Sequence, residues 1–566
     1  MINNSKYFDK STLVLLLCLF NFCSFGQTII VGDILSEGFI RRSQINGNAK
    51  LTHSLMIRPI IQPDSAFWGD SISRLQFDTL NGWYRDKFSY SLLNKRISFS
   101  LLPLTITQQL NSRNPYGWND GAMIPSRGFQ ILASPGFFVK AGILSFQFRP
   151  EMVWAQNSNF DTFSSAHSDI VWANRYYFMN RIDLPEKFPN NNYTRFLLGQ
   201  SSLRVNYKAL SFGISSENLW WGPGTRNSLI MSNNAPGFKH VTFNTFRPIT
   251  TKIGFFEFQI IAGKLNASGV LPPEVNRQFN GQALYTAKPQ DWRYLNAAII
   301  TWQPKWTKGL FLGFSRAYYL YRKDMGNSVG DYIPILGSIF KSNSLGEDNK
   351  RRDQLASFFL RWILPKEKTE FYFEYGRNDF SLNLRDILMS PEHSLAYIVG
   401  IKKLLEISGK RYVELATELT QTSISYPINF RQQEGWYRHY QVRDGYTNNG
   451  QVLGAGIGPG SNSQMISIKY YNCLSSLGIM FERIVHDKDF FDQAFIADRN
   501  SKRYWTDFAA DLSGNIKFKN CILSGNLSAI KSTNYQWGNL QENFIDNKNR
   551  YNRLNLQLKL GLKFLL

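Results

Sequence analysis

Strict alternation between apolar and polar residues marks the C-terminal end of the chain. Residues 554–566 read LNLQLKLGLKFLL: from Leu554 to Phe564 every second residue is leucine or phenylalanine, and the residues between them are Asn, Gln, Lys and Gly. Successive side chains of a β-strand point to opposite faces, so this pattern predicts a strand with one wholly apolar face and one polar face.

The same alternation recurs at 507–518, 413–420 and 370–375. A soluble antiparallel sandwich also alternates, but its strands are usually about five or six residues long. Long strands with an uninterrupted apolar face, in a chain that is 15% aromatic, favour a transmembrane β-barrel. Its sheet must close, because lipid offers no hydrogen-bond partner to a sheet edge. We therefore predict an all-β outer-membrane barrel of antiparallel strands, with the sandwich as the alternative.

The N-terminus has the pattern of an export signal. Lys6 and Lys10 precede an apolar run at 13–20, and the small residues Ser24 and Gly26 stand at a cleavage spacing. A membrane anchor is the alternative, but the run is shorter than the roughly 20 residues that cross a bilayer. We expect a mature protein in the outer membrane of a Gram-negative cell.

We expect three regions: a signal peptide at 1–26, an N-terminal periplasmic segment at 27–50, and a barrel with long extracellular loops at 51–566. The only helix that we predict after the signal lies around 33–45. Barrels of this class alternate short periplasmic turns with longer outer loops. Counting back from the C-terminus places periplasmic turns at 472–476 and 519–521, an outer loop at 487–502, and Cys473 and Cys521 too far apart for a disulfide.

Catalytic motifs were sought without success. The chain has no HExxH, CxxC or P-loop pattern, and its six histidines show no metal-ligand spacing. We expect no catalytic residues, no metal and no cofactor. His439, in GWYRHYQVRDGY, has Arg438, Arg443 and Asp444 nearby; a polar loop residue and an acid/base group are the two interpretations.

One segment, SSENLWWGPGTRNSLIMSNNAPGFKH at 215–240, suggests a binding function. Trp220 and Trp221 precede Gly-Pro-Gly, which cannot continue a strand ladder and predicts a sharp bend. The tryptophans could anchor the barrel rim at the membrane interface. They could instead form a platform for sugar rings, whose C–H groups pack well against an aromatic face.

This segment resembles the signature of the Wzi-type capsule-assembly proteins. Similar stretches follow in the same order at 353–379, 391–403 and 436–464, the last with an H-x(4)-DGY element. The resemblance implies a barrel of 18 strands with a small periplasmic helical part, loops that occlude the lumen, no enzymatic activity, and attachment of capsular polysaccharide to the cell surface. The polysaccharide-binding residues that it suggests are Trp220, Trp221, Arg226, Tyr437, His439 and Tyr446.

Charge narrows the choice of partner. The chain carries 64 basic and 42 acidic residues, and the stretch 201–300, around WWGPG, has ten basic and four acidic residues. We expect a capsular polysaccharide or exopolysaccharide, anionic in character, with outer-membrane lipid and lipopolysaccharide as the other partners, no nucleic acid, and a monomer. The alternative functions are an outer-membrane diffusion channel or transporter, and a hydrolase or acyltransferase.

Overall fold

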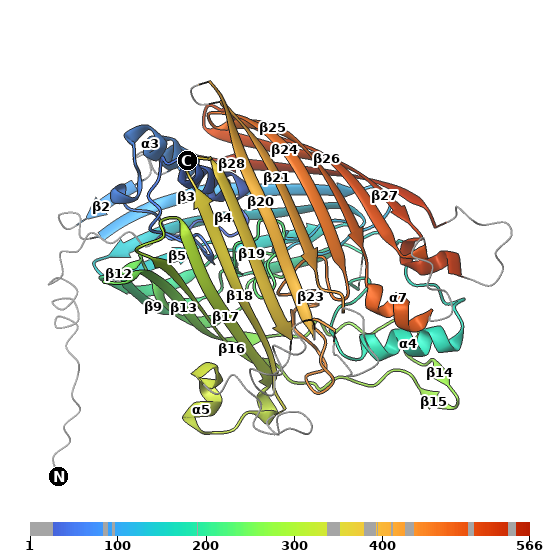
Figure 1. Cartoon of the computed structure of the whole chain (residues 1–566). Helices are drawn as coiled ribbons and strands as arrows, with labels where there is room; N and C mark the ends of the chain where they lie inside the picture. Colours follow the sequence, from blue (N-terminus) through green and yellow to red (C-terminus); the bar gives the residue numbers. More distant parts are fainter. Residues whose placement is uncertain are drawn as a thin grey trace, which may run out of the picture.

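The computed structural model describes residues 27–82, 89–92, 97–189, 191–336, 351–378, 392, 394–408, 411–424, 435–495, 503–540 and 551–565. These residues form one closed antiparallel β-barrel whose last strand, β28 (Arg553–Phe564), pairs with its first long strand, β3 (Ile97–Asn111) (Figure 1). The predicted export signal, 1–26, lies outside the described residues.

The other strands of the first half of the barrel are β2 (Ser89–Leu92), β4 (Gly128–Ala141), β5 (Leu144–Phe148), β6 (Glu151–Ala155), β7 (Tyr193–Leu197), β8 (Ser202–Tyr207), β9 (Leu210–Ser215), β11 (His240–Thr245), β12 (Ile249–Thr251) and β13 (Gly254–Leu265). Those of the second half are β16 (Arg293–Pro304), β17 (Leu310–Tyr321), β18 (Asp353–Leu364), β19 (Thr369–Asn378), β20 (Leu395–Ser408), β21 (Arg411–Gln421), β24 (Asn462–Asn472), β25 (Ser475–Val485), β26 (Thr506–Phe518) and β27 (Cys521–Thr533).

Three small ladders and several short helices complete the described structure. The ladders are β1 (Ile57–Arg58) with β10 (Trp220–Trp221), β14 (Gln278–Phe279) with β15 (Gln282–Ala283), and β22 (Thr447–Asn448) with β23 (Gln451–Val452). The helices are α2 (Ile34–Ile45), α3 (Ser71–Leu80), α4 (Asp169–Met179), α5 (Val329–Tyr332) and α7 (Lys488–Ala494), with 3-10 turns η1 (Ser65–Phe67), η3 (Arg322–Asp324), η4 (Pro334–Leu336) and η6 (Tyr535–Leu540). Within the described ranges, no helix combines the length and apolarity needed to cross a membrane.

Counted over the described residues, the closed sheet has eighteen strands. The pairs β5 and β6, β7 and β8, and β11 and β12 each form one interrupted strand, and β2 only extends an edge of β3. The prediction of an all-β antiparallel barrel is confirmed, as is the strand number that the family resemblance implied.

The alternation read from the sequence separates lipid from lumen. In β28, Leu554 is 58% exposed on the outside, whereas Asn555 and Gln557 are almost fully buried. In β19, Phe371 and Phe373 face outward, while the intervening polar side chains point into the lumen. Because the outward face is apolar along strand after strand, this is the surface of a membrane-embedded barrel.

The two ends of the barrel differ. Turns of two residues join β24 to β25 and β26 to β27, as the sequence predicted, and α3 and the C-terminus lie at that end (Figure 1). Helices α4, α5 and α7 belong to loops at the opposite end (Figure 1). The end with short turns is therefore periplasmic and the end with long loops is outside. Cys473 and Cys521, at the periplasmic turns, are both free thiols.

The N-terminal segment 27–82 packs against the periplasmic end. The predicted helix is confirmed as α2, whose N-cap Asp33 accepts a hydrogen bond from the Ser36 amide (3.2 Å). A second helix, α3, was not predicted. Phe39 and Phe77 bring the two helices into one apolar cluster. Residues 51–82 thus group with the segment before them, and the N-terminal segment is longer than the predicted 27–50.

Candidate functional site

The WWGPG segment lies inside the barrel. Trp220 and Trp221 form β10, which pairs with β1 of the N-terminal segment. Both side chains are buried, and the Trp221 indole donates to the Gln259 side chain on β13 (2.9 Å). Neither ring reaches the membrane interface, so their interpretation as rim anchors is wrong. The bend follows at Gly222, whose φ of +123° suits glycine and whose missing Cβ would meet the Glu374 carboxylate at 2.9 Å.

A buried carboxylate holds the bend against the barrel wall. Glu418, an inward residue of β21, accepts hydrogen bonds from the backbone amides of Thr225, Arg226 and Asn227 at 2.8–3.2 Å. The hydroxyls of Thr225 (3.0 Å) and Tyr372 (2.8 Å) also donate to it. Successive backbone amides that converge on one anion are a strong anchor. The acceptor is a side chain of the barrel wall, and the backbone donors belong to the loop.

Arg226 is already paired within the lumen. Its guanidinium contacts both oxygens of Glu482 on β25 (2.7 and 3.2 Å) and lies over the Trp118 ring, 4.1 Å from the centroid. Burial alone would lower the pKa of Arg226, but the Glu482 carboxylate outweighs burial and raises it. The positive charge is therefore permanent, and Glu482 neutralises it locally.

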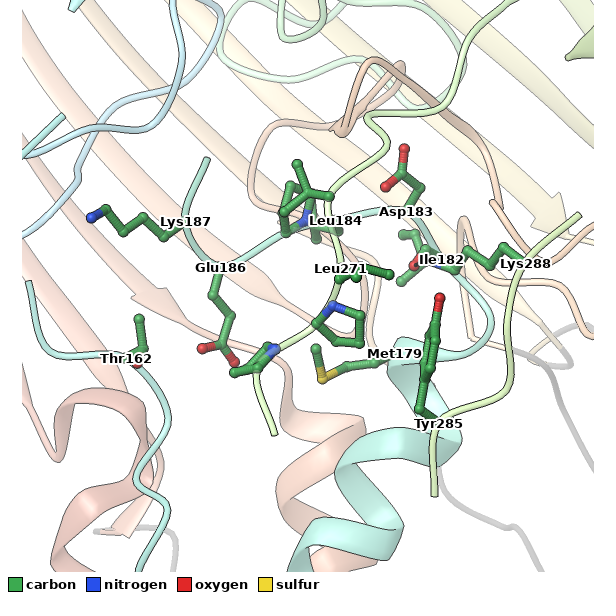
Figure 2. A pocket seen from close by; sticks show the side chains of 14 residues that line it. Thr162, Met179, Ile182, Asp183, Leu184, Glu186, Lys187, Leu271, Tyr285 and Lys288 are labelled. Carbon is green, nitrogen blue, oxygen red and sulfur yellow. Dashed lines mark hydrogen bonds between the residues drawn. The ribbon is translucent and has the colours of Figure 1, made fainter. Parts of the chain in front are cut away.

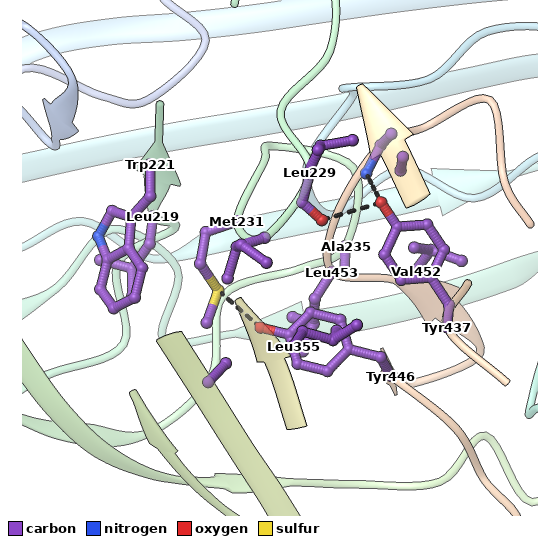
Figure 3. Packing of buried hydrophobic residues seen from close by; sticks show 14 of the residues in the cluster. Leu219, Trp221, Leu229, Met231, Ala235, Leu355, Tyr437, Tyr446, Val452 and Leu453 are labelled. Carbon is purple, nitrogen blue, oxygen red and sulfur yellow. Dashed lines mark hydrogen bonds between the residues drawn. The ribbon is translucent and has the colours of Figure 1, made fainter. Parts of the chain in front are cut away.

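Tyr437 and Tyr446 lie deep in the apolar cluster that also contains Trp221 (Figure 3). The Tyr437 hydroxyl donates to the Leu229 carbonyl (2.9 Å) and accepts from the Ala455 amide (2.8 Å). The Tyr446 hydroxyl contacts the Met231 sulfur at 3.7 Å, and the two tyrosine rings stack with an interplanar angle of 17°. These bonds tie loop 435–461 to loop 216–239.

His439 is buried nearer to the outer end. Its Nδ1 accepts hydrogen bonds from the amides of Val442 (2.9 Å) and Gln441 (3.2 Å), and its ring stacks on Tyr440. A His439 ring that is buried in this turn and held by these hydrogen bonds fits a structural role. Among the described residues, no cluster of three or more His, Cys, Asp or Glu side chains could hold a metal ion.

The structure therefore brings five of the six predicted residues into the packed lumen and places His439 at its outer side. Polysaccharide binding by these residues stays a prediction. For the four aromatic rings, which are at most 3% exposed, contact with a sugar would require the loops to open. Tight packing holds those loops closed.

An open pocket of about 230 Å³ lies above this packed lumen, at the outer end (Figure 2). It is formed by the loops 156–192 and 266–292. Tyr285 and Lys288 line one side and Glu186 and Lys187 the other, with leucines and prolines between them (Figure 2). The pocket was not predicted. The only sequence signal for it is the proline content of the two loops, which does not reveal that they meet.

The pocket rests on the loop that carries H-x(4)-DGY. The Asp183 amide donates to the Asp444 carbonyl (2.8 Å), and the His439 amide donates to the Arg181 carbonyl (3.0 Å). The Asp183 carboxylate in turn accepts from the Ser268 amide (2.6 Å), which fixes the second loop. The predicted segment 436–464 thus supports the pocket from below.

Helix α7 packs on α4, whose last residue, Met179, lines this pocket (Figure 1). Asp489 of α7 is buried. The Asp489 carboxylate accepts a hydrogen bond from the Ile424 amide (2.9 Å). Burial raises the pKa of Asp489 from 3.8 to about 7, although Arg438 opposes the shift; Asp487 adds to it. The folded loop therefore holds a proton that the unfolded chain releases between these pH values.

The sign of the pH effect follows from this uptake. Stability falls as pH rises wherever the folded state binds more protons than the unfolded state. We expect the α7 amides to lose a few kcal/mol of protection between pH 4 and pH 7, measured by hydrogen exchange corrected for intrinsic rates. Asp489→Asn should abolish this dependence, and Asp492→Asn on the same helix should keep it. Wild-type protection that is constant over this range would contradict the assignment.

The fold and the site together define a class: an outer-membrane β-barrel whose lumen is filled by its own loops and N-terminal segment. The family model of capsule assembly protein Wzi matches residues 136–518, so the chain belongs to the Wzi capsule assembly family. The predicted resemblance is confirmed.

One solved structure in particular agrees on the fold. The chain is similar to Wzi of Escherichia coli, with a TM-score of 0.60 and 13% identity over 95% of this chain and 99% of that one. That protein is described as an outer-membrane protein involved in group 1 capsule assembly and a carbohydrate-binding β-barrel. OpdL of Pseudomonas aeruginosa (TM-score 0.38, 10% identity, 83% of this chain and 98% of that one) and OccAB4 of Acinetobacter baumannii (0.36, 9%, 82% and 97%) also match. No curated protein matches the sequence significantly.

Proposed function

We propose that this protein binds exported capsular polysaccharide or exopolysaccharide at its outer end and attaches it to the cell surface, without catalysing a reaction. The observation that carries the proposal is an open pocket of mixed aromatic and charged lining directly above a packed lumen. Membership of the Wzi family and the carbohydrate binding described for the Escherichia coli protein support it.

The chemistry of the pocket suits a polysaccharide. The Tyr285 ring offers an apolar face for sugar C–H groups, and the lysines at 187 and 288 offer positive charge to acidic sugars. Burial lowers the pKa of Lys288, and the carboxylates of Asp183 and Asp444 oppose this shift.

The six residues taken from the family resemblance enter this proposal as positioning residues. Arg226, Tyr437 and Tyr446 hold the luminal loops together, and His439 lies on the loop that supports the pocket. A diffusion channel needs a water-filled path, and the described residues that fill the lumen argue against one.

The pocket is tested by replacing its aromatic side chain. We expect Tyr285→Ala to weaken binding of the purified polysaccharide about tenfold, because a stacked ring contributes roughly 1 kcal/mol beyond its buried area. In cells, polysaccharide should shift from the cell-attached to the shed fraction while the barrel is assembled in normal amount.

Tyr332→Ala is the matched control, since Tyr332 is an exposed tyrosine of another outer loop and does not line the pocket. It should leave retention unchanged. Equal retention by the Tyr285 variant, the control and the wild type would refute the pocket as the binding site.

A further inference from the structure

A second depression lies in the outer half of the barrel wall, where strand β7 lacks a neighbour. Among the described residues, β7 pairs only with β6, whereas β8 continues the wall to β9. A cavity of about 170 Å³ occupies this notch, bounded by Leu198 on one side and by Lys239 and Lys264 on the other. Arg195 and Asn449, joined by a 2.6 Å hydrogen bond, lie at its inner end.

Two lysines face each other across the strands at this notch. The Lys264 amide donates to the Lys239 carbonyl (3.0 Å), one step beyond the paired residues His240 and Gly263. Both side chains are exposed, and both have the parity of Val241, which is on the lipid-facing side. Like charges directly opposite each other on a sheet are destabilising, and a bound anion would remove the repulsion between these two lysines.

No described acidic residue supplies that anion. Other basic residues of the 201–300 stretch are matched: Arg204 pairs with Glu217, Arg226 with Glu482 and Arg277 with Asp169. In the described structure, Lys239 and Lys264 form no ion pair, and Lys264 only lies over the Trp292 ring, 5.2 Å from its centroid. Part of the basic excess of this stretch therefore lies at the notch, on the outer side.

The surface below the lysines is apolar. Val241 and Phe243 continue the outward face of β11 toward the membrane centre, and their pairing partners Ile214 and Phe212 do the same on β9. All four are more than a third exposed. Positive charge at the outer end of the strands and apolar side chains beneath it match an amphiphile with an anionic headgroup and acyl chains.

We propose that the notch binds the phosphate-bearing headgroup of an outer-leaflet lipid, with Lys239 and Lys264 contacting the phosphate and Arg195 lying behind them. The proposal is independent of the outer pocket and of the polysaccharide. A bound lipid would neutralise the facing lysines and fix the barrel's depth in the outer leaflet.

The test uses the full-length protein in phosphatidylcholine nanodiscs, titrated with bis-phosphorylated lipid A. We expect Lys239→Gln with Lys264→Gln to weaken binding about 30-fold, the effect of two lysines at a membrane surface. Lys208→Gln with Lys252→Gln is the matched control, because these lysines lie in the periplasmic turns β8–β9 and β12–β13 and also form no described ion pair. The control should bind like the wild type.

Three further arms separate the possible ligands. Dephosphorylated lipid A should bind the wild type as weakly as the double variant, and inorganic phosphate should not compete. Full competition by inorganic phosphate would overturn the lipid assignment in favour of a free anion. The third arm measures binding of a soluble acidic polysaccharide. Unchanged lipid A binding by the double variant would overturn the site, and so would a double variant that loses only its binding of this polysaccharide.

Discussion

Replacing Glu418 by alanine is expected to release loop 216–239 from the barrel wall and to make a filled lumen conduct ions. The carboxylate accepts hydrogen bonds from three successive amides, Thr225 to Asn227, and from two hydroxyls. Its removal leaves those amides buried without an acceptor, at about 1–3 kcal/mol each. A loss of about 5 kcal/mol is of the order of a whole domain's stability, so the loop should open while the barrel persists.

Planar-bilayer recordings and limited proteolysis of loop 216–239 provide the measurements. Glu414→Ala is the matched control, because Glu414 lies on the same strand and face but pairs with Lys402 (3.9 Å), toward the periplasmic end. The control should stay closed and resist cleavage in this loop. A Glu418 variant that is as closed as the wild type would show that the amide contacts do not hold the loop.

Alternation predicted which side chains of a strand face the lumen, because that property depends only on parity along one strand. The alternating pattern predicts that Glu370 and Glu374 point to the face opposite Phe371 and Phe373, and both glutamates are buried inside the barrel. Their partners could not be predicted. The amides that bind Glu418 lie almost 200 residues away in sequence, and only barrel closure brings them together.

Local sequence was also ambiguous for the aromatic residues. A Trp-Trp-Gly-Pro-Gly bend suits a membrane rim, a sugar platform or a buried turn, and the pairing of β10 with the distant β1 excludes the membrane rim. Helix α3 carried a readable signal, the N-cap Asp70 (2.6 Å to the Ser73 amide), followed by Phe77 and Leu80 on one buried face. The predicted barrel start at residue 51 placed this stretch among the strands, so the helix was not predicted.

Glu370→Ala is expected to release the N-terminal segment 27–82 from the wall. The carboxylate pairs with Arg41 of α2 (2.7 Å to Nε) and with Arg361 of β18 (2.8 Å), and all three side chains are buried. Arg41 also donates to the Pro223 carbonyl (2.7 Å), so this cluster joins helix, wall and bend. Removing the acid leaves two buried guanidinium groups uncompensated, which costs about 3–5 kcal/mol.

Hydrogen exchange can separate this effect from that of Glu418. In the Glu370 variant the α2 amides should exchange faster, since α2 loses its ion pair to the wall. Glu374→Ala is the control: its carboxylate lies on the same face of β19 but contacts the Leu229 amide (3.5 Å) instead of α2. Protection of α2 should therefore survive in the control and fall in the Glu370 variant. Equal protection in both would mean that apolar packing of α2 on α3, through Phe39 and Phe77, holds the segment without the ion pair.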